Sequence, residues 1–482
     1  MLDPRPIFFV LGLLLTTVAA AMLIPAAADA LANNSDWQAF LGAAAFTGFI
    51  GVALVLTNRA GPVALNVRQM FVLTTLSWTA IAAFGAIPLA FADLDLTYTD
   101  AYFEAMSGIT TTGSTVLTGL DTAPPGILLW RALLQWLGGI GIIVMAVAVL
   151  PLLQVGGMQL FRMESSETSD KALPRTAQIA AGITAIYLVL TGICALALLA
   201  AGMSGFDAAT HAMTTIATGG FSTHDASVGF FRSPLIHWII VAGMLLGSLP
   251  FLLYLDALRG RGGRLFRDTQ VQTFFGIVVV TVAAIAVWRA ATGGVGAEQA
   301  VRESAFNLIS VITGTGYSTT DYGAWGQFAV TLLFLCMFIG GCAGSTSCGI
   351  KVFRFQVLYA AAKSQVSRLW HPHGVFLPQY NHKPLPDSVI GAVMNFVFLF
   401  AVAFVVLALA LAALGLDFVT SVSSAATAIS NVGPALGDIA GPAGNFSSFP
   451  DAAKWVLSLG MLLGRLELFT VLVLLAPGFW RG

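Results

Sequence analysis

Charged residues are scarce in this sequence. Only 9% of its 482 residues are Asp, Glu, Lys or Arg, whereas 57% are hydrophobic and the mean hydropathy is +0.86. An average soluble domain carries about 25% charged residues, so this inventory cannot build a water-facing surface. Hydrophobic runs of about twenty residues indicate membrane-spanning helices and not the alternating strands of a barrel. The composition predicts an all-α polytopic membrane protein embedded in the lipid bilayer.

Signals of enzymatic or nucleotide chemistry are also lacking. Cys194, Cys336, Cys342 and Cys348 lie in or beside hydrophobic segments, with neither metal-ligand spacing nor a disulfide framework. The histidines show no zinc spacing, and no phosphate-binding glycine loop is present. A membrane enzyme would need clustered His, Asp, Glu or Cys at one depth, so we expect no enzyme and no cofactor. No basic, aromatic stretch suggests a nucleic-acid partner.

Residues 1–62 predict an N-terminal transmembrane hairpin. The segments 7–26 and 39–58 have roughly the 20 hydrophobic residues that a spanning helix needs. The first segment also fits a secretory signal peptide, because Arg5 precedes it and an alanine-rich stretch follows. Its full spanning length favours a retained helix.

The remaining chain is interpreted as four divergent copies of one unit, each with a helix, a short segment, a glycine loop and a second helix. The units cover residues 63–160, 161–262, 263–370 and 371–482, and their aligned glycines are Gly113, Gly219, Gly316 and Gly433. The short segments 101–110, 207–217, 301–312 and 419–430 are about half as long as a span, so each must enter and leave on one side. This pattern predicts four helix–pore-loop–helix repeats around a pseudo-fourfold pore.

Lysine and arginine are distributed unevenly between the two sides of this layout. With the N-terminus inside, sixteen fall on the inner side and Arg465 falls within a span. Five fall on the outer side, namely Arg131, Arg232, Arg289, Arg302 and Lys454. This bias is the positive-inside signature of a bacterial plasma-membrane protein. The glycine loops should therefore approach from outside, and the basic loops 151–177, 258–270 and 351–387 should face the cytoplasm.

The four glycine loops are the predicted functional site. Irregular backbone at membrane depth is tolerated only where protein surrounds it or where it lines water. One such loop could be an ordinary turn, but four together satisfy the condition by framing a pore. Glycine lets carbonyl oxygens turn toward an axis, where they can replace the water shell of a monovalent cation. The short helices would point their negative C-terminal ends toward that cation.

A run of small residues in unit three is a candidate gate. Glycine costs about 1 kcal/mol relative to alanine in a helix, so the second helix of this unit should open into an intramembrane loop. Such a loop could block the pore or swing aside; the alternatives are a small-residue packing face or an ordinary helix end. The candidate gating residues are Gly340, Gly341, Gly344, Ser345, Thr346, Ser347 and Gly349.

Arg465 is a second gating candidate. It lies in the middle of a predicted hydrophobic helix, where a lone charge costs about 2.5–3.5 kcal/mol on insertion scales. Glu467 is two positions along and is not a natural helix neighbour. We expect Arg465 to face the pore and to repel cations; the alternative is a buried ion pair with another carboxylate. Glu104 is expected near the outer mouth, attracting cations or simply solvated, and His211 is expected to open the second half-helix without a further role.

Several segments resemble a known family. The sequences SGITTTGST, GGCAGSTSCGIKVFR and MLLGRLELFTVLVLL, together with the fourfold repeat, resemble the Trk/Ktr/HKT superfamily and especially its bacterial TrkH-type membrane subunit. The resemblance covers essentially the whole chain, including the N-terminal hairpin. Loop two (IATGGFST) departs at Ala217, and loop four departs most, with Asn431 and Val432 before its glycine and Pro434 after it. Single glycines imply a filter that is shorter and less selective than the one in strict potassium channels.

The resemblance implies potassium uptake through a filter, with K⁺ as the transported ion. It matches the small-residue run to an intramembrane gate and Arg465 to a pore arginine. It also implies a homodimer and a cytoplasmic, TrkA-like nucleotide-binding regulatory subunit. The implied filter residues are Thr111, Thr112, Gly113, Ala217, Thr218, Gly219, Gly314, Thr315, Gly316, Asn431, Val432 and Gly433. The alternative is a symporter coupling potassium to protons or sodium, which would need titratable carboxylates within spans.

Overall fold

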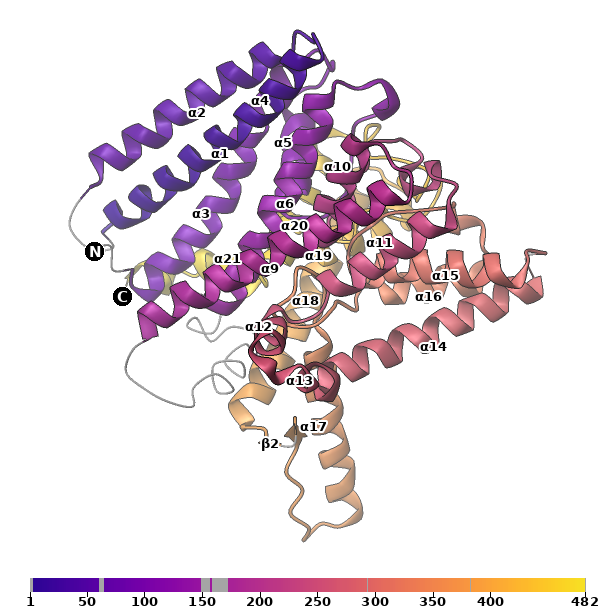
Figure 1. Cartoon of the computed structure of the whole chain (residues 1–482). Helices are drawn as coiled ribbons and strands as arrows, with labels where there is room; N and C mark the ends of the chain where they lie inside the picture. The colour runs from indigo at the N-terminus through magenta and orange to yellow at the C-terminus, as the bar shows by residue number, and fades with distance from the viewer. Residues whose placement is uncertain are drawn as a thin grey trace.

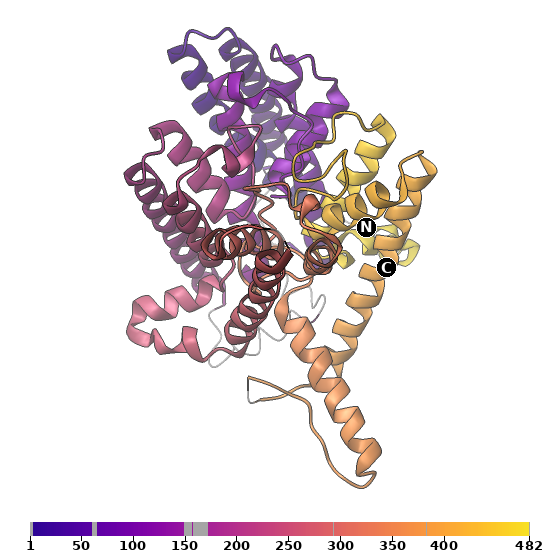
Figure 2. The same cartoon turned by 90° about the vertical axis from the view of Figure 1, so that its right-hand side faces the viewer.

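A computed structural model describes residues 3–59, 65–148, 157, 172–292, 294–381 and 383–481. The chain is a bundle of helices from which one helix and a short hairpin project (Figures 1 and 2). Most of the predicted basic loop 151–177, and the predicted unit boundaries near residues 62 and 160, lie outside the described residues. Within them, seven helices are long and apolar enough to cross a membrane, or nine if two bent pairs each count as one span. The chain is therefore a multi-pass membrane protein.

The N-terminal hairpin has the predicted form and is tied to the rest of the molecule. It consists of α1 (Arg5–Leu31) and α2 (Trp37–Thr57). Val18 and Met22 of α1 are buried in the main core. The backbone amide of Gly126, at the start of α6 (Pro125–Ala148), donates to Asp29 Oδ1 at 2.6 Å, so the Asp29 carboxylate lies where the helix dipole favours an anion. The hairpin is thus tied to the start of α6.

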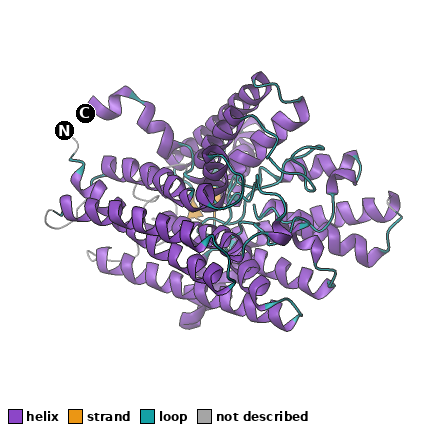
Figure 3. Cartoon of the chain, turned by 90° about the horizontal axis from the view of Figure 1, so that it is seen from above, coloured by secondary structure: helices purple, strands orange, loops and turns teal. Residues whose placement is uncertain are grey.

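Four short helices lie at the positions expected for the half-length segments. They have 12 to 16 residues, below the roughly 20 needed for a span. Loops gather among the helices in the middle of the molecule (Figure 3). Side-chain caps start three of them, from Thr97, Ser204 and Asp417. The half-helices are α5 (Tyr98–Ile109), α10 (Gly205–Ile216), α15 (Ala297–Ile312) and α19 (Phe418–Ser430).

Each half-helix is preceded by a long helix, which is broken in unit one, and is followed by the second helix of its unit. The preceding helices are α3 (Val67–Gly85) with α4 (Ile87–Phe91), α9 (Ala172–Ala200), α14 (Thr269–Thr292) and α18 (Asp387–Ala413). The following helices are α6, α11 (Pro234–Gly247) with α12 (Phe251–Asp256), α16 (Gln327–Cys336), and α20 (Asp451–Arg465) with α21 (Phe469–Leu472). The remaining elements are η1 (Leu120–Thr122), η2 (Ser227–Phe230), η3 (Ala257–Arg261), α13 (Gly263–Arg267), η4 (Tyr322–Ala324), α17 (Val352–Trp370), β1 (Gln379–Tyr380), β2 (Lys383–Pro384), η5 (Val473–Leu475) and α22 (Pro477–Arg481).

The second helices of units two and four are broken, whereas the repeat pattern predicts one second helix in each unit. The first bends by 91° after Gly247 and the second by 109° after Arg465. Pro250 follows the first break, and proline cannot continue a helix through its own position. At the second break, Glu467 and Leu468 have φ of +58° and +50°, left-handed values that end a helix.

Candidate functional site

The four glycine loops share one backbone shape. Each leaves its half-helix through a residue with positive φ, passes one further residue, and reaches a glycine that again has positive φ. The first residues are Thr111, Thr218, Gly314 and Asn431, with φ of 52°, 50°, 70° and 53°; the glycines are Gly113, Gly220, Gly316 and Gly433, with φ of 88°, 78°, 85° and 111°. A left-handed residue at a helix C-terminus lets the next amides bond back to the last carbonyls.

This shape shifts the predicted register of loop two by one residue. The amide of Gly219 bonds to the carbonyl of Thr214 at 2.8 Å, as the amide of Thr112 bonds to that of Ser107 at 2.9 Å. Gly219 is therefore the counterpart of Thr112, and Gly220 is the counterpart of Gly113. Ala217 belongs to the end of the half-helix, where it is the C-cap. Two consecutive glycines allowed either alignment of the sequence.

The loops touch one another in a closed cycle. A methyl group placed on a glycine of one loop would come too close to a carbonyl oxygen of the next loop. The distance from the added methyl carbon to the carbonyl oxygen is 2.4 Å for Gly113 and Gly219 O, and 1.7 Å for Gly220 and Thr315 O. It is 2.2 Å for Gly316 and Val432 O, and 2.9 Å for Gly433 and Thr112 O. The structure thus brings the predicted loops together at one place, and their contacts require glycine. A cation there would meet neutral main-chain oxygens.

All four loop glycines also line one hollow, which we call the loop hollow. It is bordered by Gly113, Gly220, Gly316 and Gly433 together with polar residues such as His224 and Asn445. Ser114 Oγ donates to Gly433 O at 2.7 Å across its wall. The hollow therefore gives a small solute access to the ring of loops.

Polar side chains of the half-helices hold the segments that leave the loops. Glu104 Oε2 accepts from the amide of Val116 at 2.9 Å, and Asn307 Oδ1 accepts from the amide of Thr319 at 3.1 Å. These pairs occupy equal positions around Gly113 and Gly316. In loop four, Ser423 Oγ accepts from the amide of Leu436 at 3.0 Å. Such bonds fix the loops from behind without occupying their shared centre.

Glu104 has neither of the roles expected from the sequence, since it is fully buried. Its Oε1 pairs with Arg131 Nε at 2.7 Å and accepts from Thr115 Oγ1 at 2.9 Å. Arg131 also donates to Ser222 O at 2.8 Å and so joins loops one and two. Arg289 and Lys454, placed like Arg131 among the outer basic residues, are likewise buried in ion pairs, with Glu303 and Asp100. The available sequence signal was an acidic residue in one apolar segment and a basic residue in a neighbouring one, which together indicate a buried ion pair.

Glu104→Gln should destabilise the protein. Removing one charge of a buried pair leaves the other uncompensated and costs about 3–5 kcal/mol. We expect a clear fall in the apparent melting temperature of the detergent-solubilised protein. Glu298→Gln is the matched control, because Glu298 pairs with Arg302 but its side chain is 68% exposed, and surface pairs contribute little. Equal melting temperatures for both variants would contradict the structural role of Glu104.

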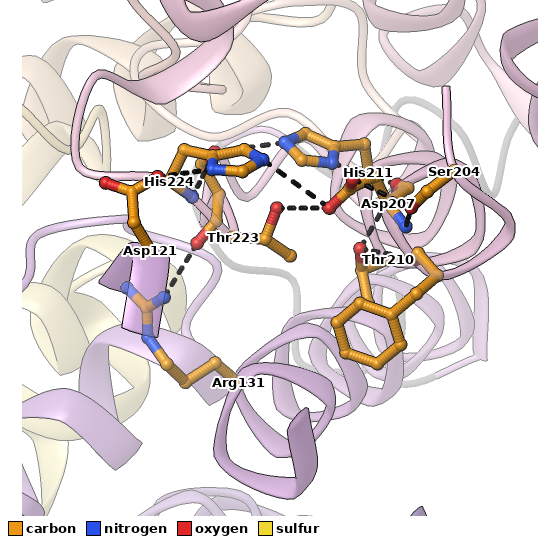
Figure 4. A network of polar contacts seen from close by, with 10 residues as sticks. Asp121, Arg131, Ser204, Asp207, Thr210, His211, Thr223 and His224 are labelled. Atoms are coloured by element: carbon orange, nitrogen blue, oxygen red, sulfur yellow. Dashed lines mark hydrogen bonds and ion pairs between the residues drawn. The ribbon is translucent and has the colours of Figure 1, made fainter. Parts of the chain in front are cut away.

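A polar network surrounds His224 beside loops one and two (Figure 4). His224 Nδ1 lies 2.5 Å from Asp121 Oδ1, and this hydrogen bond holds the pKa of the Asp121 carboxyl below its usual range. Asp207 accepts from Thr223 Oγ1 at 2.7 Å. His211, expected at the start of its half-helix, lies instead within α10, fully buried, with Nε2 3.0 Å from Ser222 Oγ. The sequence did not reveal this contact, because the partners lie in a loop of irregular shape.

Gln135 of α6 is a further residue that the sequence did not reveal. Its Nε2 donates to the carbonyl of Gly219 at 2.6 Å, and its Oε1 accepts from the amide of Phe221 at 3.0 Å. The side chain thus clamps loop two on both sides of Gly220. A lone glutamine in a hydrophobic helix was the available signal.

The small-residue run in unit three forms the predicted loop. Helix α16 ends at Cys336, and residues 337–351 separate it from α17. We call this segment the gating loop after the role expected of it from the sequence. The loop is buried and folded on itself, with the amide of Gly340 bonded to Ile350 O at 2.9 Å. The break after α11 holds it, since the amides of Cys342 and Thr346 donate to Ser248 O and Gly247 O at 3.0 and 3.1 Å.

Arg465 contacts this gating loop. It was expected in the middle of a helix, but it is the last residue of α20. It is 1% exposed. Its guanidinium donates to Thr346 O at 3.2 Å, Cys348 Sγ at 2.6 Å and Gly138 O at 2.9 Å. No carboxylate among the described residues forms an ion pair with it, so the expected alternative of a buried ion pair finds no support there. Because its hydrogen-bond acceptors are neutral, the positive charge of Arg465 is not cancelled by a negative one.

A second, narrow hollow lies between Arg465 and the small residues of the gating loop. Cys348, Lys351, Phe396 and Glu467 contribute to its wall with Arg465. Glu467 pairs with Arg354 of α17, and the Lys351 ammonium donates to Ser347 O. Lys351 and Arg354 were not singled out in the sequence, although they follow the small-residue run directly.

Known proteins share this architecture. A model of the TrkH family, described as a cation transport protein, matches residues 37–480. The Trk system potassium uptake protein TrkI of Halomonas elongata is 47% identical over 99% of this chain and 97% of its own length. The Trk system potassium uptake protein TrkH of Escherichia coli K12 is 40% identical over 99% of each chain. The crystal structure of the potassium transporter TrkH from Vibrio parahaemolyticus matches with a TM-score of 0.92 and 38% identity, covering 100% of both chains.

These similarities confirm the resemblance seen in the sequence motifs. They extend over nearly the whole length of the chain and include its spans, half-helices and loops. A multi-pass protein with such relatives is a plasma-membrane protein. The chain therefore belongs to the TrkH family of cation transport proteins.

Proposed function

We propose that this protein takes up potassium across the bacterial plasma membrane through a pore framed by its four glycine loops. The closed cycle of contacts between those loops is the observation that carries the proposal. Relatives over the full chain length are named potassium uptake proteins, which supports K⁺ as the transported ion. In this account each quarter of the chain contributes one helix–loop–helix repeat, and the repeats surround a pseudo-fourfold axis.

The filter consists of main-chain carbonyls in the register of the observed backbone shape. Its residues are Thr111, Thr112, Gly113, Thr218, Gly219, Gly220, Gly314, Thr315, Gly316, Asn431, Val432 and Gly433. Gly220 thus enters the set and Ala217 leaves it. Rings of neutral oxygens replace the hydration shell of a monovalent cation, and the C-terminal ends of the half-helices add a favourable potential.

The gating loop closes the pore below the filter, and Arg465 holds it. The three hydrogen bonds of Arg465 fasten Thr346 and Cys348 of the loop to Gly138 of α6. The guanidinium also places a positive charge on the ion path, which repels cations. Opening therefore requires the loop and Arg465 to separate.

A cytoplasmic partner would control this gate. Helix α17 starts at the end of the gating loop and projects from the bundle (Figure 2), so a protein bound to it could pull on the loop. A homodimer of this chain with a TrkA-like nucleotide-binding subunit is the assembly we propose. The relatives' membership in a Trk system supports a regulatory partner.

Ion flux into proteoliposomes tests the proposal. Purified protein is reconstituted, and uptake of potassium, rubidium and sodium is followed under an imposed gradient of each ion. We expect potassium and rubidium to enter faster than sodium, and potassium flux to follow its own gradient. Equal flux of the three ions would refute the potassium filter. Uptake driven by a proton or sodium gradient would instead support the symporter.

A further inference from the structure

Thr346 of the gating loop is hydrogen-bonded directly to loop two. Its Oγ1 lies 3.1 Å from Thr218 Oγ1, whose hydroxyl can donate to it or to Ala217 O at 2.8 Å. Thr346 Oγ1 itself donates to Ile216 O or Gly247 O, which lie 3.1 and 2.8 Å away. Its amide donates to Gly247 O, and its carbonyl accepts from Arg465. One buried threonine thus contacts the filter loop, the broken helix α11 and the arginine that holds the gate.

This contact depends on glycine at position 247. A methyl group there would come 2.8 Å from Ile216 O and 3.2 Å from Thr346 Oγ1. The break in α11 after Gly247 removes the next helical turn and leaves room for the gating loop. Thr218 in loop two and the break after Gly247 in α11 are therefore both needed for the contact with Thr346.

Side chains of the other filter loops do not make the equivalent bond within the described residues. Thr111 Oγ1 is buried without a hydrogen-bond partner there, and Gly314 has no side chain. Asn431 Nδ2 bonds to Thr112 Oγ1 and Met461 O, both at 2.9 Å. Loop two is thus the filter loop whose side chain contacts the gating loop.

We propose that the hydroxyl pair of Thr218 and Thr346 couples the gate to the filter, with Thr346 as a positioning residue for loop two. This inference rests on the proposed filter and gate. Thr218 holds a φ of +50°, which is strained for a β-branched residue and persists only where surrounding contacts impose it. When the gating loop moves, Thr218 loses one of those contacts. Gate opening then changes the shape of loop two and, with it, ion selectivity.

Thr346→Val tests the coupling, because valine keeps the shape and removes the hydroxyl. A hydrogen bond is worth a few-fold to about tenfold in an equilibrium. We expect basal potassium flux into proteoliposomes to rise about threefold to tenfold. The ratio of potassium to sodium affinity of the closed, purified protein, measured from ion-dependent shifts of its melting temperature, should fall by a similar factor. Thr346→Ser should restore both. Thr218→Val should lower the ratio. The double variant Thr218→Val/Thr346→Val should match Thr346→Val alone, because that single change already removes the bond to Thr218.

Thr47→Val is the control, because it removes a buried threonine hydroxyl of α2, in the N-terminal hairpin, that has no hydrogen-bond partner among the described residues. It should leave flux and ratio unchanged. If Thr346→Val raises flux at an unchanged ratio, the gating loop acts only as a plug and the coupling is refuted. Additive effects of the two valine substitutions would also refute it. Failure of the wild-type protein to discriminate potassium from sodium would instead refute the proposed filter.

Discussion

Arg465→Ala should raise potassium flux by at least about tenfold. The substitution removes three hydrogen bonds from a charged donor, and such bonds contribute about 1.5–3 kcal/mol each. It also removes a positive charge from the proposed cation path, where a low dielectric strengthens repulsion. Loss of the bonds favours the open state, and loss of the charge lowers the barrier to cations. Initial uptake rates in proteoliposomes, normalised to the amount of monodisperse protein, give the measurement.

Two further variants separate the bonds of Arg465 from its charge. Arg465→Lys keeps the charge but cannot reach Thr346 O, Cys348 Sγ and Gly138 O together, because an ammonium lacks the planar fork of a guanidinium. Arg465→Gln removes the charge but retains an amide donor. If repulsion dominates, the glutamine variant conducts faster than the lysine variant. Flux at or below the wild-type level in folded Arg465→Ala would contradict the gating role.

Gly113→Ala should abolish most discrimination between potassium and sodium. Gly113 has a φ of +88°, and its added methyl group would lie 2.4 Å from Gly219 O in the neighbouring loop. Left-handed backbone costs an L-residue about 1–2 kcal/mol, and the clash forces the carbonyl out of its place. We expect the potassium-to-sodium flux ratio to fall by about tenfold or more.

Gly119→Ala is the matched control for this substitution. Gly119 has a φ of +73° in the same connecting segment, but its nearest neighbour, Thr122 Oγ1, would lie 3.9 Å from the added methyl group. It carries the backbone strain without the clash, so the flux ratio should stay at the wild-type value. An unchanged ratio in Gly113→Ala would show that loop one does not shape the filter.

Hydrophobic length and glycine content predicted most of the fold. The hairpin, the half-helices and the interruption after α16 follow from how many apolar residues a span needs and from how poorly glycine propagates a helix. The breaks after Gly247 and Arg465 did not follow from these rules. Pro250 was a visible signal for the first break, but the left-handed Glu467 and Leu468 could not be foreseen from local sequence.

The candidate site was predictable in outline and not in detail. The position of each loop could be predicted from the local glycines. The meeting of the four loops could be inferred from the fourfold repeat. The register of loop two was ambiguous because Gly219 and Gly220 satisfy the same pattern. Ion pairs such as Glu104 with Arg131, and the contact of Arg465 with the gating loop, join residues 27 and over 100 positions apart and depend on the assembled fold. The spacing of residues along the sequence does not show which distant residues come into contact.

Anomalous diffraction from crystals soaked in thallium or rubidium would locate the bound cation directly, because both ions mimic potassium and can be located without reference to the protein density. We expect an anomalous peak enclosed by the four loops, next to the carbonyl oxygens of Thr112, Gly219, Thr315 and Val432. Ions bound only away from these loops, or bound there by side-chain carboxylates, would contradict the proposed filter.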